Sequence, residues 1–506
     1  MKKTLAIIIT ALGCAAANAQ EINAVVARQG NAGQEMVRLT NTPNISLNEN
    51  GITLKKGETN VESYSFNNGD ITVLFASAIN STESTENFTH PAVIENGGKL
   101  TVSGTMANPN AQDLVIEDGG QFRFDAGTAN AIVEKIITGY NDGNGNWYLV
   151  ASPISETTPT AVGMIDQTTP ANYGLYIFNQ SNENGEEWNN YKVQSFNIEN
   201  QNGYLYARKN GTTLVFDGQL VATAGGKELV FDANAQFKGF NLIGNPYTCD
   251  AYINRNFYRM NDEGTELIPA SGAIHALEGV FVQATTIGET VTFSKDAPAT
   301  QNGLCAMTLS QGTATIDRII VNFGKGGNLD KFMLNESNTK LFIPQNDMDF
   351  ATIATEAKIG EVPVSFKAAK DGSYTITVNT ENVEVKYLHL IDNMTGADID
   401  LLAAASTGSA SYSFEAKTSD YASRFKLLFG VKDDTLTGSG SNFVYISNGN
   451  LVIKNIEGQA TLQIIDVLGR VVSSEVVSGS YNKTLNMKAG VYVINLDGIT
   501  QKIVVK

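Results

Sequence analysis

Val93-Ile94-Glu95-Asn96-Gly97-Gly98-Lys99-Leu100-Thr101-Val102 is followed 22 residues later by a second copy, Val115-Ile116-Glu117-Asp118-Gly119-Gly120-Gln121-Phe122-Arg123-Phe124. Each copy predicts a strand, an Asx-Gly-Gly turn and an alternating strand, and the two glycines permit a positive φ at the corner. A period of about 20 residues with one turn per repeat is typical of stacked β-solenoid rungs. Hairpins of a β-sandwich are the alternative, because only one weaker copy, around Ile52-Thr53-Leu54, accompanies the two clear ones.

The stretch from about 136 to 305 contains a second internal repeat. Trp147-Tyr148-Leu149-Val150-Ala151-Ser152-Pro153-Ile154 is similar to Phe240-Asn241-Leu242-Ile243-Gly244-Asn245-Pro246-Tyr247. Each is an apolar strand that ends at a proline, which cannot donate a hydrogen bond to a sheet. Short β-branched and aromatic runs separated by Asn/Gly-rich turns lie between the two copies. We therefore expect a β-sandwich with a duplicated motif.

Short alternating strands continue from about 306 to 432, and their spacing predicts an immunoglobulin-like sandwich. Residues 433–441, which are rich in Asp, Thr, Gly and Ser, predict a flexible linker. The expected fold class is all-β and multidomain. The expected parts are a signal peptide at 1–19, a β-solenoid-like or hairpin-rich region at 20–135, β-sandwich domains at 136–305 and 306–432, a linker at 433–441, and a small immunoglobulin-like β-sandwich at 442–506.

The C-terminal residues 442–506 form the most distinctive module. Leu462–Val472 predicts a strand, a Gly-centred turn and a second strand, and two further strands end the chain. This ordered set resembles the C-terminal sorting domain of Bacteroidetes proteins exported by the type IX secretion system. The resemblance implies recognition by the outer-membrane secretion machinery. The residues that carry it are Leu468, Gly469, Arg470, Gly490, Val491, Tyr492, Lys502, Val504, Val505 and Lys506.

The body also looks like uncharacterised Bacteroidetes surface proteins that carry this tail, so the resemblance covers roughly residues 90 to 506. It implies a modular exported protein whose tail is cleaved and whose body is linked to a surface lipid or released. It brings no known catalytic residues. Asp434-Thr435-Leu436 also resembles the acceptor of Bacteroidetes O-glycosylation, which makes Thr435 a candidate site; a plain polar linker is the alternative.

The N-terminus agrees with export. Lys2 and Lys3 precede an apolar run over residues 5–17, and Ala17-Asn18-Ala19 offers a small-residue cleavage site before Gln20. The run is shorter than the roughly 20 apolar residues that span a bilayer. We predict a cleaved signal peptide and a mature chain without a transmembrane span, located at the cell surface or secreted.

The composition narrows the classes of partner. The chain of 506 residues has 52 acidic and 35 basic side chains, for a net charge of −17. An acidic protein is a poor match for nucleic acid, whose binding depends on Lys and Arg neutralising phosphates. A charged fraction of 17%, below the usual value of about 25%, suits strands and turns more than surface helices.

The cysteines leave two questions open. Cys14, in Leu12-Gly13-Cys14, gives a lipoprotein signal as a weaker alternative to ordinary cleavage. Cys249 and Cys305 can form a disulfide in an oxidising compartment or remain two small buried thiols. Neither has a metal-ligand partner at close spacing.

No catalytic constellation can be assembled from the sequence. The histidines, which fall in three different expected regions, are His90, His275 and His389. His389 alternates with apolar residues, which favours a structural role. Glu186 and Glu187 are candidates for the paired carboxylates of a glycosidase. A solvated hairpin loop is the favoured interpretation of that acidic run.

The sequence assigns neither a metal site nor a glycan site. Asp142–Asn146 begins like a calcium loop, but Trp147 and Pro153 stand where an EF-hand needs Gly and Glu. We assign no cofactor and no metal ligand, and leave calcium binding by other Asp/Asn-rich loops open. Four aromatic side chains could form a glycan platform or belong to the core. They are Trp188, Tyr191, Tyr204 and Tyr206.

Three functions remain as hypotheses. The first is a non-enzymatic, adhesin-like or structural cell-surface β-protein, whose partners would be glycans or host or surface proteins. The second is a glycan-binding or polysaccharide-active secreted protein. The third is a secreted hydrolase, which the scarcity of His and Cys disfavours.

Overall fold

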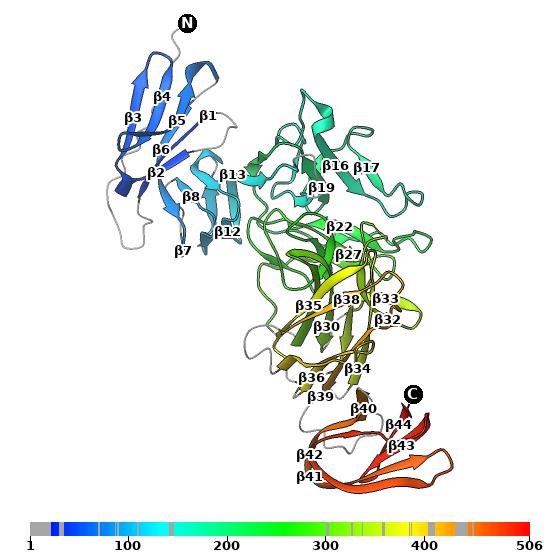
Figure 1. Cartoon of the computed structure of the whole chain (residues 1–506). Helices are drawn as coiled ribbons and strands as arrows, with labels where there is room; N and C mark the ends of the chain where they lie inside the picture. The colour runs from blue at the N-terminus through cyan, green and yellow to red at the C-terminus, as the bar shows by residue number, and fades with distance from the viewer. Residues whose placement is uncertain are drawn as a thin grey trace. The chain divides into compact units, whose positions relative to one another are not determined.

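The computed structural model describes residues 22–29, 35–68, 71–86, 88, 91–108, 111–140, 146–299, 303–324, 327–335, 337–356, 360–383, 385, 387–402, 410–430, 444–447 and 450–505. These residues form strands and a few short 3₁₀ turns (Figure 1). The expected all-β, multidomain fold class is confirmed. The chain divides into two compact units, one with residues up to 265 and 271–298, the other with 266–270 and 299 onward.

The 22-residue repeat forms stacked rungs. Strands β8 (Ala92–Ile94) and β9 (Lys99–Val102) belong to the first copy, and β11 (Leu114–Ile116) and β12 (Gln121–Phe124) to the second. Equivalent strands pair in parallel, with Val93 opposite Val115 and Leu100 opposite Phe122. Strands β6 (Ile71–Ile79) and β7 (Thr82–Thr85) add a preceding rung. A parallel register between copies is the solenoid arrangement and excludes hairpins here.

The glycines of the repeat fit this stacking. Gly97 and Gly119 have φ values of 81° and 86°. Gly98 and Gly120 lie against the rung before: a Cβ would come within 2.1 Å of the Ile79 carbonyl oxygen at Gly98 and within 2.6 Å of that of Ile94 at Gly120. The first glycine therefore makes the turn and the second permits close backbone approach.

The weaker copy around residues 52–54 is not a rung. It lies in β4 (Gly51–Lys56), the middle strand of an antiparallel sheet with β3 (Pro43–Asn48) and β5 (Thr59–Ser65). Strand β1 (Ala24–Gln29) also pairs antiparallel with β2 (Glu35–Arg38) and β6. The solenoid interpretation therefore holds for the rungs from β6 onward and not for the whole of 20–135.

The expected boundary at residue 135 does not separate two compact units. Strand β13 (Gly127–Ile137) continues the solenoid by pairing in parallel with β10 (Met106–Asn108) and β11, and it also pairs antiparallel with β20 (Thr212–Gln219) of the next region. One hydrophobic core also spans the boundary, and contains Phe122 as well as Tyr204. Shared hydrogen bonds and a shared core make 22–265 one folded body.

The duplicated motif forms two sheets with the same strand order. In the first, β14 (Tyr148–Ala151) pairs with β19 (Gly203–Arg208), which pairs with β16 (Tyr173–Phe178). In the second, β22 (Phe240–Gly244) pairs with β27 (Gly279–Gln283), which pairs with β24 (Phe257–Met260). Each also has a small side sheet, β15 (Glu156–Thr157) with β18 (Ile198–Glu199), and β23 (Ala251–Tyr252) with β26 (Ala273–Ile274).

The second compact unit begins before the expected boundary, because β29 starts at Gly303 and runs through residue 305. The strands of this unit between residues 303 and 430 share one large core, and they pair antiparallel except where β30 runs parallel to β33. They are β29 (Gly303–Gln311), β30 (Ala314–Phe323), β31 (Leu329–Asp330), β32 (Lys340–Gln345), β33 (Met348–Thr355), β34 (Gly360–Lys367), β35 (Gly372–Glu381), β36 (Tyr387–Asp392), β37 (Asp398–Asp400), β38 (Ala410–Ala416) and β39 (Phe425–Gly430).

The C-terminal module has a core of its own, to which Leu451, Leu462 and Ile494 belong. The sequence prediction of strand, turn and strand is confirmed by β41 (Asn450–Asp466) and β42 (Val471–Thr484). Strands β40 (Val444–Ser447), β43 (Gly490–Leu496) and β44 (Ile499–Val505) complete the sheet. Among the described residues of the whole chain, no helix is long and apolar enough to cross a membrane.

Candidate functional site

The two duplicated sheets meet at a seam of backbone hydrogen bonds. The Ala151 amide donates to the Leu277 carbonyl, and the Gly244 amide donates to the Gln201 carbonyl, each at 2.9 Å. Ala151 and Gly244 occupy the same place in the two copies, directly before Ser152-Pro153 and Asn245-Pro246. The duplication therefore yields a near-symmetric joint.

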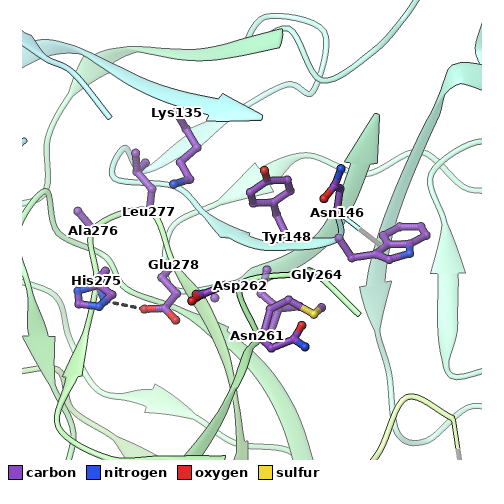
Figure 2. Close-up of a pocket in the computed structure, with 14 residues that line it drawn as sticks. Lys135, Asn146, Tyr148, Asn261, Asp262, Gly264, His275, Ala276, Leu277 and Glu278 are labelled. Carbon is purple, nitrogen blue, oxygen red and sulfur yellow. Dashed lines mark hydrogen bonds between the residues drawn. The ribbon is translucent and has the colours of Figure 1, made fainter. Parts of the chain in front are cut away.

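A pocket of about 270 Å³ opens beside this seam within the first compact unit (Figure 2). Its polar lining comes from Lys135, Asn146, Asn261, Asp262, His275 and Glu278. Its aromatic and aliphatic lining comes from Trp147, Tyr148, Leu149, Met260 and Leu277. Figure 2 shows Lys135 and Tyr148 on one side, with His275, Glu278 and Asp262 on the other. A concave site with a few convergent polar groups is the usual form of a ligand site.

Glu278 is fixed in the pocket wall. Its carboxylate accepts two hydrogen bonds from Arg259, from Nε at 2.9 Å and from a terminal nitrogen at 2.7 Å. It also accepts the backbone N–H of His275 at 2.7 Å. Both partners of the ion pair are about one-fifth exposed. A bidentate pair of this kind holds the carboxylate rigidly.

His275 projects from the same wall. Its ring is 62% exposed, and Nδ1 lies 3.0 Å from Oδ1 of Asp250. The hydrogen bond with His275 contributes most to holding the pKa of the Asp250 carboxyl below its ordinary value. The histidine therefore presents its outer edge to solvent as a polar group.

The opposite wall is held by bonds to the backbone of the loop after β13. The Tyr148 hydroxyl accepts the Thr138 amide at 3.0 Å, and Asn146 Nδ2 donates to the Gly139 carbonyl at 2.6 Å. Lys135 is ion-paired at 2.9 Å with Asp118, the Asx residue of the second solenoid turn. The solenoid and the duplicated sheets thus both contribute to the pocket.

The arrangement suits hydrogen bonding to a neutral polar ligand. Amides, carboxylates and an imidazole alternate with two aromatic residues, which is the mixture that binds the hydroxyls and the apolar face of a sugar. Among the described residues, no group of three or more His, Cys, Asp or Glu side chains is placed to hold a metal ion.

Two of the four aromatic candidates for a glycan platform are core residues. Tyr204 and Tyr206 are 1% and 0% exposed, and their hydroxyls bond to backbone groups at Glu199 and Met164. Trp188 and Tyr191 are half-buried and do not join the pocket lining. The core interpretation is thus confirmed for the tyrosine pair, because alternate residues of β19 face the same core.

Glu186 and Glu187 belong to a loop, as the sequence favoured, but the expectation that both are solvated is wrong for Glu187. Glu187 is 3% exposed, and both its carboxylate oxygens accept the backbone N–H of Gly185, at 3.0 and 3.1 Å. Glu186 is exposed. The Glu187 carboxylate is hydrogen-bonded within the turn, whereas the Glu186 side chain faces solvent. The two acids therefore do not converge on a common substrate position.

Of the histidines, His275 lies in the pocket and His389 lies in the second unit. His389 is 3% exposed, and its Nδ1 is 2.6 Å from Oδ1 of Asp398, which confirms a buried structural setting. His90 and most of the calcium-like loop, residues 142–145, lie outside the described residues.

Cys249 and Cys305 are buried free thiols. Burial raises the pKa of Cys249 to about 11 and that of Cys305 to about 12. The structure thus contains the second of the two alternatives drawn from the sequence.

The residues of the C-terminal motif fall at a turn and on the last two strands. Asp466 organises the turn: its Oδ1 accepts the amides of Leu468 and Arg470 at 2.9 and 3.0 Å, and its Oδ2 pairs with the Arg470 guanidinium at 2.7 Å. Gly469 has a φ of 78°, which favours glycine.

The remaining motif residues lie on β43 and β44, which pair antiparallel. Val491 is opposite Val504, and Gly490 is opposite Val505. Tyr492 donates its hydroxyl hydrogen to the Lys488 carbonyl at 3.0 Å. Some predicted residues lie outside the described part of the chain. They are Ala17, Ala19, Gln20, Thr435 and Lys506.

Sequence reasoning missed the pocket because its walls come from distant segments. The usable signals were the Pro-ended strands that form the seam and the polar run Asn261-Asp262 directly after an apolar strand. Comparison with protein-family models finds no family that matches this chain, and a search of curated proteins finds no match either.

Proposed function

We propose that this protein is an exported cell-surface β-protein with an adhesin-like or structural role, delivered through its C-terminal module. One observation carries the proposal: the turn at 466–470 is presented outward on a module with its own core. Leu468 is 74% exposed and the Arg470 side chain 73% exposed. An apolar and a cationic side chain held out by a fixed turn favour recognition by another protein.

Further exposed apolar side chains lie beside Leu468 at this turn. Val467, Val471 and Val472 are each about half exposed or more, so the apolar surface continues from the turn into β42. Large apolar side chains that gather on a surface usually mark an interaction site. This supports a docking role for the module and leaves the body free to act outside the cell.

Deletion of residues 442–506 tests the delivery step. We expect the truncated protein to be lost from the surface of intact cells, measured with a membrane-impermeant labelling reagent and normalised to total protein. The finer variant is Leu468→Ala with Arg470→Ala, and the matched control is Val193→Ala, at a residue 88% exposed in the first unit. Normal surface labelling of the truncated protein would show the assignment to be wrong.

A second candidate function is glycan binding at the pocket beside the seam. The observation that favours it is the combination of Asn261, Asp262 and His275 with the aromatic pair Trp147 and Tyr148. The purified protein can be screened on a glycan array and for release of reducing sugar. We expect Asp262→Asn to abolish any signal and Glu186→Gln to leave it unchanged. Silence of the wild-type protein in both assays would remove this candidate.

A further inference from the structure

Asp317 is a carboxyl group inside the core of the second unit. It is 1% exposed and lies on β30 in alternation with Ile319 and Val321, two residues of the hydrophobic core. Alternate residues of a strand share a face, so its side chain points inward. Burial of a charged group is costly unless it is paired, so the residue needs a specific partner.

That partner is Lys331, whose side chain is 3% exposed. Its Nζ lies 2.5 Å from Oδ1 and 2.6 Å from Oδ2 of Asp317. Because both oxygens are bonded to Cγ, Nζ also lies closer to the carboxyl carbon than the ~3–3.5 Å from which attack can begin. An amine and a carboxyl carbon are thus held together without solvent.

Two backbone amides also donate hydrogen bonds to the Asp317 carboxyl group. The amide of Arg318 donates to Oδ1, and the amide of Leu341 donates to Oδ2, each at 2.7 Å. N–H groups aimed at a carboxyl oxygen would also stabilise the negative charge of a tetrahedral intermediate formed there.

A second acid completes the cluster. Glu266 is only 9% exposed, belongs to the same compact unit as Asp317 and Lys331, and interacts electrostatically with both. Burial raises the pKa of Glu266 to about 7, and Asn338 donates a hydrogen bond to its Oε1. Burial also raises the pKa of Asp317. A group that is half protonated near neutral pH is suited to both accepting and donating a proton.

We propose that Lys331 and Asp317 become joined by an intramolecular isopeptide bond, with Glu266 as the group that transfers protons. The ammonium first passes a proton to the Asp317 carboxylate, which gives a neutral amine and a neutral acid. The Nζ lone pair then attacks Cγ. Glu266 takes the proton released from nitrogen and returns it to a hydroxyl of the intermediate, which leaves as water.

The reaction balances without a co-reactant. One ammonium and one carboxylate give one secondary amide and one water, no atom changes oxidation state, and Glu266 ends as it began. The bond would fasten β30 covalently to the segment after β31, inside the core. This inference is independent of the C-terminal module and of the pocket.

The second unit also contains a buried ion pair that serves as an internal control for Asp317 and Lys331. Asp392 and Arg424 are also a buried ion pair, 0% and 1% exposed, with 2.9 Å between Oδ2 and a terminal guanidinium nitrogen. The guanidinium stays protonated in proteins and is not a nucleophile. Covalent joining is therefore expected at the lysine pair and not at the arginine pair.

Peptide mass spectrometry of the purified full-length protein tests the proposal. We expect a branched peptide that contains Asp317 and Lys331 and is lighter by one water than its two unlinked parts, while peptides with Asp392 and Arg424 stay linear. Lys331→Arg should abolish the branched peptide. Glu266→Gln should slow its formation by roughly 10²–10⁴-fold, the usual contribution of a general acid–base group. Only unlinked peptides from the wild-type protein would overturn the bond, and full linkage in Glu266→Gln at early times would overturn the role of Glu266.

Discussion

Gln201 and Leu277 are equivalent residues at the seam between the two duplicated sheets. Neither is glycine, yet their φ values are 63° and 61°. The carbonyl of each accepts a hydrogen bond from the opposite sheet, at 2.9 Å from the Gly244 and Ala151 amides respectively. A left-handed conformation costs an L-residue roughly 1–2 kcal/mol. Because the same strained turn occurs twice, the two halves share their seam geometry as well as their strand order.

The seam predicts a sharp steric effect at Gly203. A Cβ there would lie 2.8 Å from both the Ile243 carbonyl oxygen and the Leu242 side chain. We expect Gly203→Ala to lower the free energy of unfolding by about 1–3 kcal/mol, the usual cost of overpacking. Urea denaturation followed by tryptophan fluorescence would measure it.

The matched control is Gly225→Ala. Nothing lies within 4 Å of a Cβ at Gly225, and its φ is not in the left-handed region. The alanine there should be neutral or stabilise by about 0.4–1 kcal/mol, through the unfolded chain. Equal losses at the two positions would contradict the seam geometry.

The pocket wall depends on the charge of Glu278. Glu278→Gln keeps the shape of the side chain but weakens its bidentate pair with Arg259 and its bond to the His275 amide. Hydrogen bonds to charged groups contribute about 1.5–3 kcal/mol, so we expect a loss in that range. Thermal unfolding would measure it, with the exposed Glu186→Gln as a control expected to change nothing. An unchanged Glu278→Gln protein would show that the ion pair does not stabilise the wall.

The local features of the fold could be predicted from the sequence, because the residues that specify them are adjacent. The corner of each rung and its stacking are both set by two glycines in the turn, Gly97-Gly98 and Gly119-Gly120. The 22-residue period was therefore sufficient to predict stacked rungs. The Pro-ended strands likewise revealed the duplication. The extent of the solenoid could not be predicted, since residues 52–54 have the same alternation but pair antiparallel.

The sites could not be predicted, because their residues come together only through tertiary pairing. Lys135 reaches the pocket on a solenoid strand, and Glu278 through the seam. The sequence likewise gives no signal that Glu266 lies near Asp317 in the folded protein. One signal was available: Asp317 alternates with the apolar residues Ile319 and Val321 on its strand, and a charge at such a core-facing position requires a partner.

The two thiols should be unreactive in the folded protein. Cys249 and Cys305 are buried, and their raised pKa values of about 11 and 12 leave almost no thiolate at neutral pH. With residues 1–19 removed, we expect a disulfide-exchange dye to report no thiol in the native protein and two in denaturant without reductant. No thiol in unreduced, denatured protein would instead reveal a disulfide.

Glu266 gives the second unit a pH dependence of definite sign. Burial raises the pKa of Glu266 from 4.5 to about 7 in the folded state, so the folded protein binds a proton that the unfolded chain has released. Its contribution to stability is complete below about pH 4.5 and is lost as the pH rises through 7. Glu266→Gln should not show this loss. We therefore expect the unfolding free energy of the wild type, relative to the variant, to fall by about 1–2 kcal/mol between pH 5 and pH 8, after allowance for solvent screening. Urea denaturation at the two pH values would measure it, with Glu186→Gln as the control. A wild type that gained stability over Glu266→Gln as the pH rose would mean that Glu266 is charged in the folded state, and would remove it as a proton-transfer group.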